Sequence, residues 1–378
     1  IQAAAIRLDG TYNAADAQAT PHITAKSYDG DLTLGKVFVA EGDTSTALSP
    51  QDILGFSVTK TIFPKEVGTP VPYLDYADGE FVESVCATYT TLSAALAGGS
   101  TTLASGWSVV DADTTVATRI TCNGDVHLIL EDGLTLTANA GIGVDNGNAL
   151  TVYAQSENRS AMGKLLSTGD DAHSGIGGSI TVSSNPSGAI TINGGDVEAT
   201  GGTYAAGIGG GAHKGGGEIT VNGGTVAARG GSGGPGLGSG GSANGNAAGS
   251  GSVVSITGGI VVATGGDRAA GIGGGGSIGT GGLDAGSGGT ITISGGDVTA
   301  TAGSDAAAIG GGYASNSGYS SGDGGTVTIA GGTVTATSAS GHGIGGGGSN
   351  VAGTLTRDWS DASSPANGLP RITASSYG

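Results

Sequence analysis

A fixed phrase recurs through the second half of the chain and constrains its fold more than any other feature. It is Gly-Thr-Ile-Thr-Ile-Ser-Gly-Gly-Asp-Val-Thr-Ala-Thr at 289–301 and Gly-Thr-Val-Thr-Ile-Ala-Gly-Gly-Thr-Val-Thr-Ala-Thr at 325–337. An Ile-Gly-Gly-Gly segment follows each of these copies. A phrase that recurs at intervals of tens of residues is typical of a stacked repeat array.

The spacing of the copies indicates where the repeat accepts insertions. Copies are 29, 35, 37 and 36 residues apart, counted from the first apolar residue of each phrase: Ile190, Ile219, Val254, Ile291 and Val327. A second, glycine-flanked apolar residue recurs at Ile176, Ile208, Ile272, Ile309 and Ile344, with Leu237 in a degraded copy. Nearly all of the length variation follows this second residue, and insertions at one point of a repeat map to loops on one face of a solenoid.

Within a copy the apolar residues alternate with polar ones. Ile190 and Ile192 point one way in an extended strand, and Gly194-Gly195 then predicts a corner, because glycine adopts a positive φ without a Cβ clash. Further short strands over 197–200 and 206–210, separated by a second corner at Gly201-Gly202, complete one coil. We therefore predict an all-β fold, a right-handed parallel β-helix (β-solenoid). The residues expected to stack on their equivalents one coil away are Ile190, Ile192, Val197 and Ile208.

The amino-acid composition is compatible with a solenoid and disfavours two classes of binding partner. Glycine supplies 81 of the 378 residues, which without a period would indicate a flexible linker, but these glycines keep register with β-branched residues. The net charge of −18 disfavours nucleic acid and anionic membranes as partners. No apolar run approaches the length of a membrane-spanning helix, so we expect no membrane insertion.

We predict four parts. A small β-sandwich-like domain over 1–80 has short alternating strands separated by turn residues. A segment over 81–117 leads into the solenoid and caps it with a short helix that starts at Ser93 and stops at Gly98. The parallel β-helix follows over 118–349, and a C-terminal cap and tail over 350–378.

The N-terminal segment is a candidate assembly region. Its apolar residues are either held within their own domain or donated as a strand to a neighbouring copy of the chain. Head-to-tail contacts of the second kind generate an open filament. The residues concerned are Ile1, Ala5, Ile6 and Leu8.

Two stretches resemble known families. The alternating runs that start at Gly124 and Gly147, with the Gly-Ile-Gly-Gly repeats after them, resemble a glycine-rich β-helix repeat region of bacterial cell-surface proteins over about 89–348. This region is also similar in style to clostridial β-helical carbohydrate-binding modules. Near the N-terminus, Ile23-Thr-Ala-Lys-Ser-Tyr-Asp-Gly30 resembles the opening strand of small YDG/MBG-type β domains. These resemblances imply an extracellular, cell-surface location and say little about mechanism.

Catalysis is the least favoured interpretation. Polysaccharide cleavage needs carboxylates and a base that converge on one face. Asp196 and Asp297 share a corner of the repeat, but the intervening copies carry Thr225 and Ile260, and no base is in phase with them. The histidines lack metal-ligand spacing. We therefore expect no enzyme, with a polysaccharide lyase as the minor alternative.

Three groups of residues are candidate sites. The variable loops carry residues suited to glycan contact, for which the alternative is solvated loop tips: Tyr204, His213, Tyr313 and Tyr319. Calcium is the one candidate cofactor, on Asp284, Asp305 and Asp323. Cys86 and Cys122 lack CxxC spacing and either form a disulfide or stay two buried thiols.

The leading hypothesis is a non-catalytic extracellular structural or adhesive protein, a building block of a bacterial surface fibre or adhesin. Its partners would then be copies of itself, joined head to tail. The alternative hypothesis is a carbohydrate-binding module that binds surface glycans through the variable loop face.

Overall fold

The structure, a computed structural model, describes most of the chain from residue 70 onward. The described residues are 70–179, 185–242, 245–278, 283–315 and 318–348, with the isolated strands 37–41, 44–48, 354–357 and 371–374. They belong to two units, one of residues 1–71 and 85–89 and the other of residues 72–84 and 90–378.

The first unit is described mainly through one antiparallel strand pair. Strand β1 (Val37–Glu41) pairs with β2 (Thr44–Leu48). The other strands expected before residue 70 lie outside the described residues. So do the predicted assembly residues Ile1, Ala5, Ile6 and Leu8.

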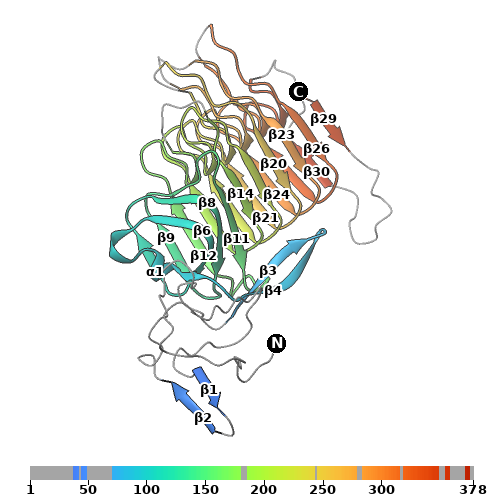
Figure 1. The fold of residues 1–378 in the computed structure, drawn as a ribbon. Helices are drawn as coiled ribbons and strands as arrows, with labels where there is room; N and C mark the ends of the chain where they lie inside the picture. The colour runs from blue at the N-terminus through green and yellow to red at the C-terminus, as the bar shows by residue number, and fades with distance from the viewer. Residues whose placement is uncertain are drawn as a thin grey trace. The chain divides into compact units, whose positions relative to one another are not determined.

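The second unit confirms the predicted parallel β-helix (Figure 1). Each full coil contributes one strand to each of three faces. The first face consists of β6 (Thr102–Val110), β8 (Ile120–Leu130), β11 (Ala149–Ala154), β14 (Ala189–Ile192), β17 (Glu218–Val221), β20 (Ser252–Ile256), β23 (Gly289–Ile293), β26 (Thr326–Ile329) and β29 (Thr354–Arg357). The second face consists of β7 (Thr114–Val116), β9 (Thr135–Ala138), β12 (Lys164–Thr168), β15 (Asp196–Thr200), β18 (Thr225–Arg229), β21 (Ile260–Thr264), β24 (Asp297–Thr301), β27 (Thr333–Thr337) and β30 (Arg371–Ala374). The third face consists of two-residue strands, β10 (Ile142–Gly143), β13 (Ile176–Gly177), β16 (Ile208–Gly209), β19 (Leu237–Gly238), β22 (Ile272–Gly273), β25 (Ile309–Gly310) and β28 (Ile344–Gly345).

The register between coils is the one that the repeat predicts. Ile190 pairs with Ile219, which pairs with Val254, and the series continues through the later copies. On the third face Leu237 keeps the register of Ile208 although its copy is degraded. Ile142, which was not predicted to belong to this series, also does so and pairs with Ile176.

Apolar side chains fill the narrow interior of the coils. Ile190, Ile192, Val197 and Ile208 are at most 1% exposed, as predicted. Complete burial of such a side chain contributes roughly 1.5–3 kcal/mol. Because each coil packs only on its two neighbours, this contribution is renewed coil by coil along the solenoid.

Many glycines are required by the close approach of neighbouring coils. Gly209 and Gly238 have φ of 125° and 141°, and a Cβ on either would collide with the carbonyl oxygen of the equivalent glycine one coil on. At the predicted first corner Gly195 has φ 97°, as expected. Gly201 and Gly202 at the predicted second corner do not have a positive φ, so their requirement for glycine has a different cause. A Cβ there would collide with backbone oxygens of the surrounding chain.

The stacked sheets reach beyond the boundaries expected from the sequence. Strand β6 already pairs in parallel with β8, so residue 118 falls inside the stack. At the other end β29 and β30 pair in parallel with β26 and β27, inside the segment expected to be a cap and tail. The coil-forming part of the chain is therefore longer than its glycine-rich part.

A short helix precedes the first long strand of the stack. Strand β5 (Thr90–Thr91) leads into α1 (Leu92–Ala95), which is followed by a 3₁₀ turn over Ala97–Gly99. The N-cap is Thr91, whose hydroxyl accepts from the Ala94 N–H at 3.3 Å, and not Ser93 as predicted. The helix ends at Ala95 with Leu96 as its C-cap and not at Gly98 as predicted, because Gly98 lies within the 3₁₀ turn, where its φ is 70°. No helix in the described part of the chain is long and apolar enough to cross a membrane.

Strands β3 (Val71–Ala77) and β4 (Glu80–Cys86) form a hairpin. Their two-residue link, Asp78-Gly79, has φ of 53° and 88°, the positive values that tight hairpin turns require. This hairpin spans the boundary predicted at residue 80. Its Asp-Gly turn is a sequence signal that the prediction overlooked.

Candidate functional site

The β3–β4 hairpin packs on the first face of the β-helix through aromatic side chains. The Tyr73 ring lies 4.7 Å from the Trp107 ring and 5.1 Å from the Tyr153 ring, centroid to centroid. Trp107 in turn stacks on His127 at 4.6 Å and 21°, because the two residues are register partners on β6 and β8. We call Tyr73, Trp107, His127 and Tyr153 the aromatic cluster.

Polar contacts fix the ring orientations in the aromatic cluster. His127 Nδ1 lies 2.9 Å from the Tyr153 hydroxyl, and His127 Nε2 lies 3.4 Å from Asp125. Burial raises the pKa of Tyr153, so its hydroxyl keeps its proton at neutral pH. The cluster thus anchors one part of the hairpin to the coils.

The hairpin also contacts the corners of later coils. The Phe81 ring lies against Gly223, where a Cβ would collide with it. Tyr76 packs edge-on against Phe81 at 5.3 Å and 64°. The glycine at this corner therefore makes room for an aromatic ring from a distant segment, in addition to turning the chain.

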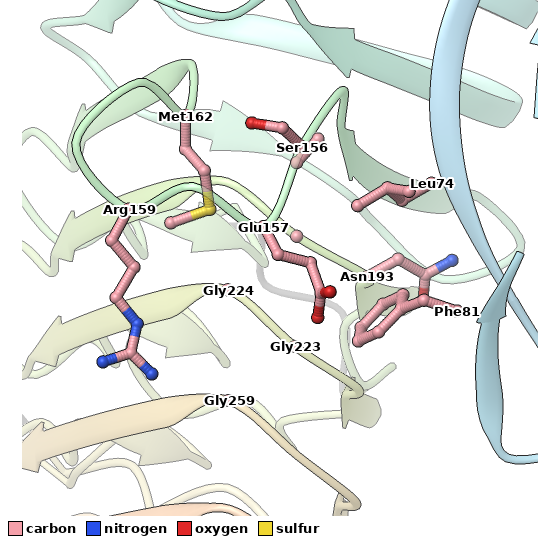
Figure 2. A pocket seen from close by; sticks show the side chains of 12 residues that line it. Leu74, Phe81, Ser156, Glu157, Arg159, Met162, Asn193, Gly223, Gly224 and Gly259 are labelled. Carbon is pink, nitrogen blue, oxygen red and sulfur yellow. The ribbon is translucent and has the colours of Figure 1, made fainter. Parts of the chain in front are cut away.

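A cavity of about 140 Å³ opens between the hairpin and the coil corners (Figure 2). We call it the hairpin hollow. Leu74, Phe81 and Met162 supply its apolar side chains, and Glu157 and Arg159 supply two opposite charges. Its remaining lining includes the backbone of Gly194, Gly223, Gly224 and Gly259 together with Ala154, Ser156 and Asn193.

The polar side chains of the hairpin hollow differ in their exposure and in whether they already form hydrogen bonds. Glu157 and Arg159 are exposed, and within the described residues neither forms an ion pair or a hydrogen bond. Asn193 is only 5% exposed, and its Oδ1 accepts from Asn222 Nδ2 at 2.9 Å. Asn222 Oδ1 accepts from the Thr257 hydroxyl at 2.7 Å, so a ladder across three coils orients the Asn193 amide. None of these residues was predicted from the sequence to belong to a site.

Two of the four predicted loop residues come together. The Tyr204 and His213 rings are near-parallel, 6.5 Å apart and at 25°. Gly241 joins them from the next coil, since its N–H donates to the Tyr204 carbonyl and its carbonyl accepts from the His213 N–H. Burial lowers the pKa of His213, against the effect of a hydrogen bond with the Ala247 backbone. His213 is therefore neutral at pH 7.

Tyr313 and Tyr319 lie apart from this pair. Neither has a ring contact with Tyr204 or His213 in the described part of the chain. The Tyr313 N–H donates to the Arg268 carbonyl at 2.8 Å, and Tyr319 is 40% exposed. The structure thus divides the predicted loop site into a stacked pair and two separate tyrosines.

Residues with a left-handed backbone conformation recur at one position of successive coils, on the side of the loops; we call them the left-handed row. Tyr204, Arg268 and Asp305 each stand four residues before the third-face apolar residue, with φ of 64°, 60° and 59°. Gly233 fills the same position in the coil between Tyr204 and Arg268, with φ 82°. Non-glycine residues rarely adopt this conformation. Arg268, which was not a predicted site residue, shares this row with Tyr204.

The predicted calcium ligands are held by separate contacts. Asp284 Oδ1 accepts from the Ser320 N–H at 2.7 Å, and the Asp323 carbonyl accepts from the Gly288 N–H. Asp305 belongs to the left-handed row. Among the described residues, no group of three or more His, Cys, Asp or Glu side chains is arranged to hold a metal ion. Calcium binding stays a prediction.

Both cysteines are buried free thiols, so the disulfide alternative is not what the structure shows. The reason lies in the strand alternation. Cys122 follows Ile120 by two residues on β8 and points into the core, where it is 1% exposed. The second alternative from the sequence, two buried thiols, describes this structure.

The corner shared by Asp196 and Asp297 contains a base after all. Lys164 is the register partner of Asp196 on the preceding coil, and its Nζ lies 2.9 Å from Asp196 Oδ2. The expectation that no base is in phase with these acids was wrong, because strand β12 keeps the register of the repeat although it lacks the glycine phrase. In this ion pair the Lys164 side chain is 51% exposed and the Asp196 side chain 20% exposed.

These features define a parallel β-helix with stacked apolar residues and glycine contacts between coils. Four segments, 190–212, 254–276, 291–313 and 327–348, match the family described as "Beta helix repeat". Each matched segment begins at the first apolar residue of the phrase and runs past the third face. This part of the chain is therefore a β-helix repeat region. Searches of curated proteins and of solved structures each found no match.

Proposed function

We propose that the chain is a non-catalytic structural element of an extracellular bacterial surface protein, a building block of a surface fibre or adhesin. The observation that supports this most is the continuous parallel pairing of the first face from β6 to β29, coil after coil. Such stacking gives a rigid scaffold in which every coil is supported by its neighbours. The low charge density and the resemblance to surface-protein repeats support the extracellular location.

The absence of catalysis is part of the same proposal. The two acids in register, Asp196 and Asp297, are separated by coils that carry Thr225 and Ile260. Asp196 is engaged by Lys164, whose Nζ lies 2.9 Å away. Acid–base cleavage of a glycan needs two carboxyl groups close to one bond. This arrangement does not favour a lyase.

Negative-stain electron microscopy tests the structural role. The full chain would be imaged at several concentrations, with and without calcium. Rods that join end to end into filaments as the concentration rises are expected, with copies of the chain as partners. Discrete single rods under all conditions would contradict the fibre proposal.

A carbohydrate-binding role of the loop face is the second candidate, favoured by the Tyr204–His213 pair. Stacked aromatic rings on a loop surface suit contact with a sugar. A glycan array compares the natural chain with Tyr204→Ala and Tyr313→Ala, with Thr299→Ala on the second face as the control. Binding that survives both tyrosine substitutions would exclude the loop face.

A further inference from the structure

We infer that the hairpin hollow binds a neutral saccharide unit. In this arrangement the sugar lies with its C–H face on the Phe81 ring and its hydroxyl groups on Glu157, Arg159 and Asn193. This site lies apart from the loop residues considered above and goes beyond the structural role proposed for the chain. Its basis is the lining shown in Figure 2.

The size and floor of the hollow suit a flat ring. Its volume of about 140 Å³ is about ten times the roughly 10–15 Å³ that one water molecule requires. Four glycines, Gly194, Gly223, Gly224 and Gly259, line it from successive coils without side chains. A ligand can therefore approach the backbone closely at this corner.

One wall of the hollow is apolar. Phe81 is half-buried, and its orientation is constrained by Tyr76 at 5.3 Å and by Gly223 behind it. Leu74 and Met162 extend the apolar lining. An aromatic face is electron-rich and attracts the slightly positive C–H groups of a sugar ring. A small number of polar groups among apolar ones is the usual composition of a small-molecule site.

The polar side chains of the hollow are best matched by a ligand that carries hydroxyl groups. Glu157 only accepts hydrogen bonds and Arg159 only donates them, whereas a hydroxyl group does both. Since the two charges are opposite and neither has a partner in the described residues, together they favour no net charge on the ligand. The Asn193 amide, 5% exposed, is already oriented by Asn222. Such preorganisation reduces the entropic cost of binding.

The charge of the whole chain argues for a neutral ligand over an acidic one. There are 13 basic and 31 acidic residues, which gives a net charge of −18. A surface of this sign repels uronic acids and sulfated sugars at a distance. Arg159 supplies one positive charge to the lining and Glu157 supplies one negative charge, so the lining has no excess of positive charge.

The test is an array of neutral and acidic oligosaccharides probed with the full chain, followed by calorimetric titration of the best-bound neutral oligosaccharide. Glu157→Gln and Arg159→Gln alter exposed, unpartnered side chains and should leave the thermal midpoint unchanged. We expect each to weaken binding about 3–10-fold, and Phe81→Ala to weaken it by more than 10-fold. Glu83→Gln, on the exposed side of β4, is the matched control and should bind like the natural chain.

Phe81→Ala also removes a contact that holds the hairpin. The proposal is therefore judged on the two polar variants, Glu157→Gln and Arg159→Gln. Loss of binding in these variants, with binding kept in Tyr204→Ala, assigns the saccharide to the hairpin hollow. Binding only of acidic oligosaccharides, binding that Tyr204→Ala abolishes and Glu157→Gln does not, or no binding of any neutral oligosaccharide, would each overturn the proposal. Failure of filaments to form would bear on the structural role alone.

Discussion

Lys164 and Asp196 occupy the same register position on consecutive coils of the second face, and Lys164 Nζ lies 2.9 Å from Asp196 Oδ2. The ion pair joins a coil that lacks the glycine phrase to the first coil that has it. The β-helical register thus continues across the change in sequence texture. Sequence periodicity alone could not show this pairing.

The ion pair should contribute little stability. The hydrogen bond with Asp196 raises the pKa of Lys164 above its ordinary value of 10.5, so the contribution is present below pH 10.5 and lost as pH rises above it. Both side chains are accessible to solvent, and an exposed pair contributes less than about 1 kcal/mol. Asp196→Asn should lower the free energy of unfolding by no more than this, and the effect should disappear in high salt. A larger, salt-independent loss would show that Asp196 has another role.

Arg119 should matter far more. Its guanidinium donates to the carbonyls of Ala140, Ser174, Ile142, Gly177 and Gly178 at 3.0–3.3 Å, and burial lowers its pKa to about 10. Arg119→Met removes this donor from all five carbonyls, of which those of Gly177 and Gly178 keep a second donor, and we expect a loss of about 3–5 kcal/mol in denaturant unfolding.

Two further variants sharpen the test of Arg119. Arg119→Lys should recover only part of the loss, since an ammonium group lacks the planar fork. Arg159→Met, at an exposed and unpartnered arginine, is the control and should unfold like the natural chain. Equal stability of Arg119→Met and Arg159→Met would contradict the buried role of Arg119.

The cysteines should be unreactive in the folded chain. Burial raises the pKa of Cys122 to about 12 and also raises the pKa of Cys86, so neither thiol forms much thiolate near pH 8. Thiol alkylation followed by mass spectrometry should label both residues only after unfolding, with or without a reductant. Labelling that requires a reductant would reveal the disulfide that this structure lacks.

His213 should make stability depend on pH. Its folded pKa lies below the ordinary 6.5 because of burial, so the unfolded chain binds a proton that the folded chain excludes once the pH falls below 6.5. Stability is therefore highest above 6.5 and decreases as the pH falls towards the folded pKa. His213→Asn should reduce the change in thermal midpoint between about pH 7.5 and about pH 5. An unchanged pH dependence would exclude this residue as its source.

The fold was largely predictable because the repeat carries two independent signals, the alternation within each strand and the recurrence of the phrase from coil to coil. The apolar positions represented by Ile190 and Ile208 have the period of strands, and their recurrence places equivalent residues side by side. Even Leu237 was placed correctly from a degraded copy. Ile142 was missed since the strand before it lacks the phrase that identifies a copy.

The candidate site was less predictable, because its residues meet only in the folded chain. Phe81 and Gly223 are far apart in the sequence but in contact in the structure, and no local sequence pattern near either residue predicts this contact. Glu157 and Arg159 stand in an ordinary polar loop after β11. Tyr204 and His213 were chosen for their chemistry, but their stacking depends on Gly241 of the next coil.

The central claim is that the glycines of the third face are required by contact between coils, and a pair of alanine substitutions tests it most directly. Gly238 and Gly106 both have positive φ, 141° and 115°. A Cβ on Gly238 would collide with the Gly273 carbonyl oxygen, whereas one on Gly106 would meet nothing within 4 Å. Each substitution strains the backbone by about 1–3 kcal/mol.

Thermal unfolding, followed by circular dichroism, compares the two variants. Gly238→Ala should lower the midpoint clearly further than Gly106→Ala, because overpacking adds about 1–3 kcal/mol to the strain. Equal shifts in the two variants would contradict the stacking described here.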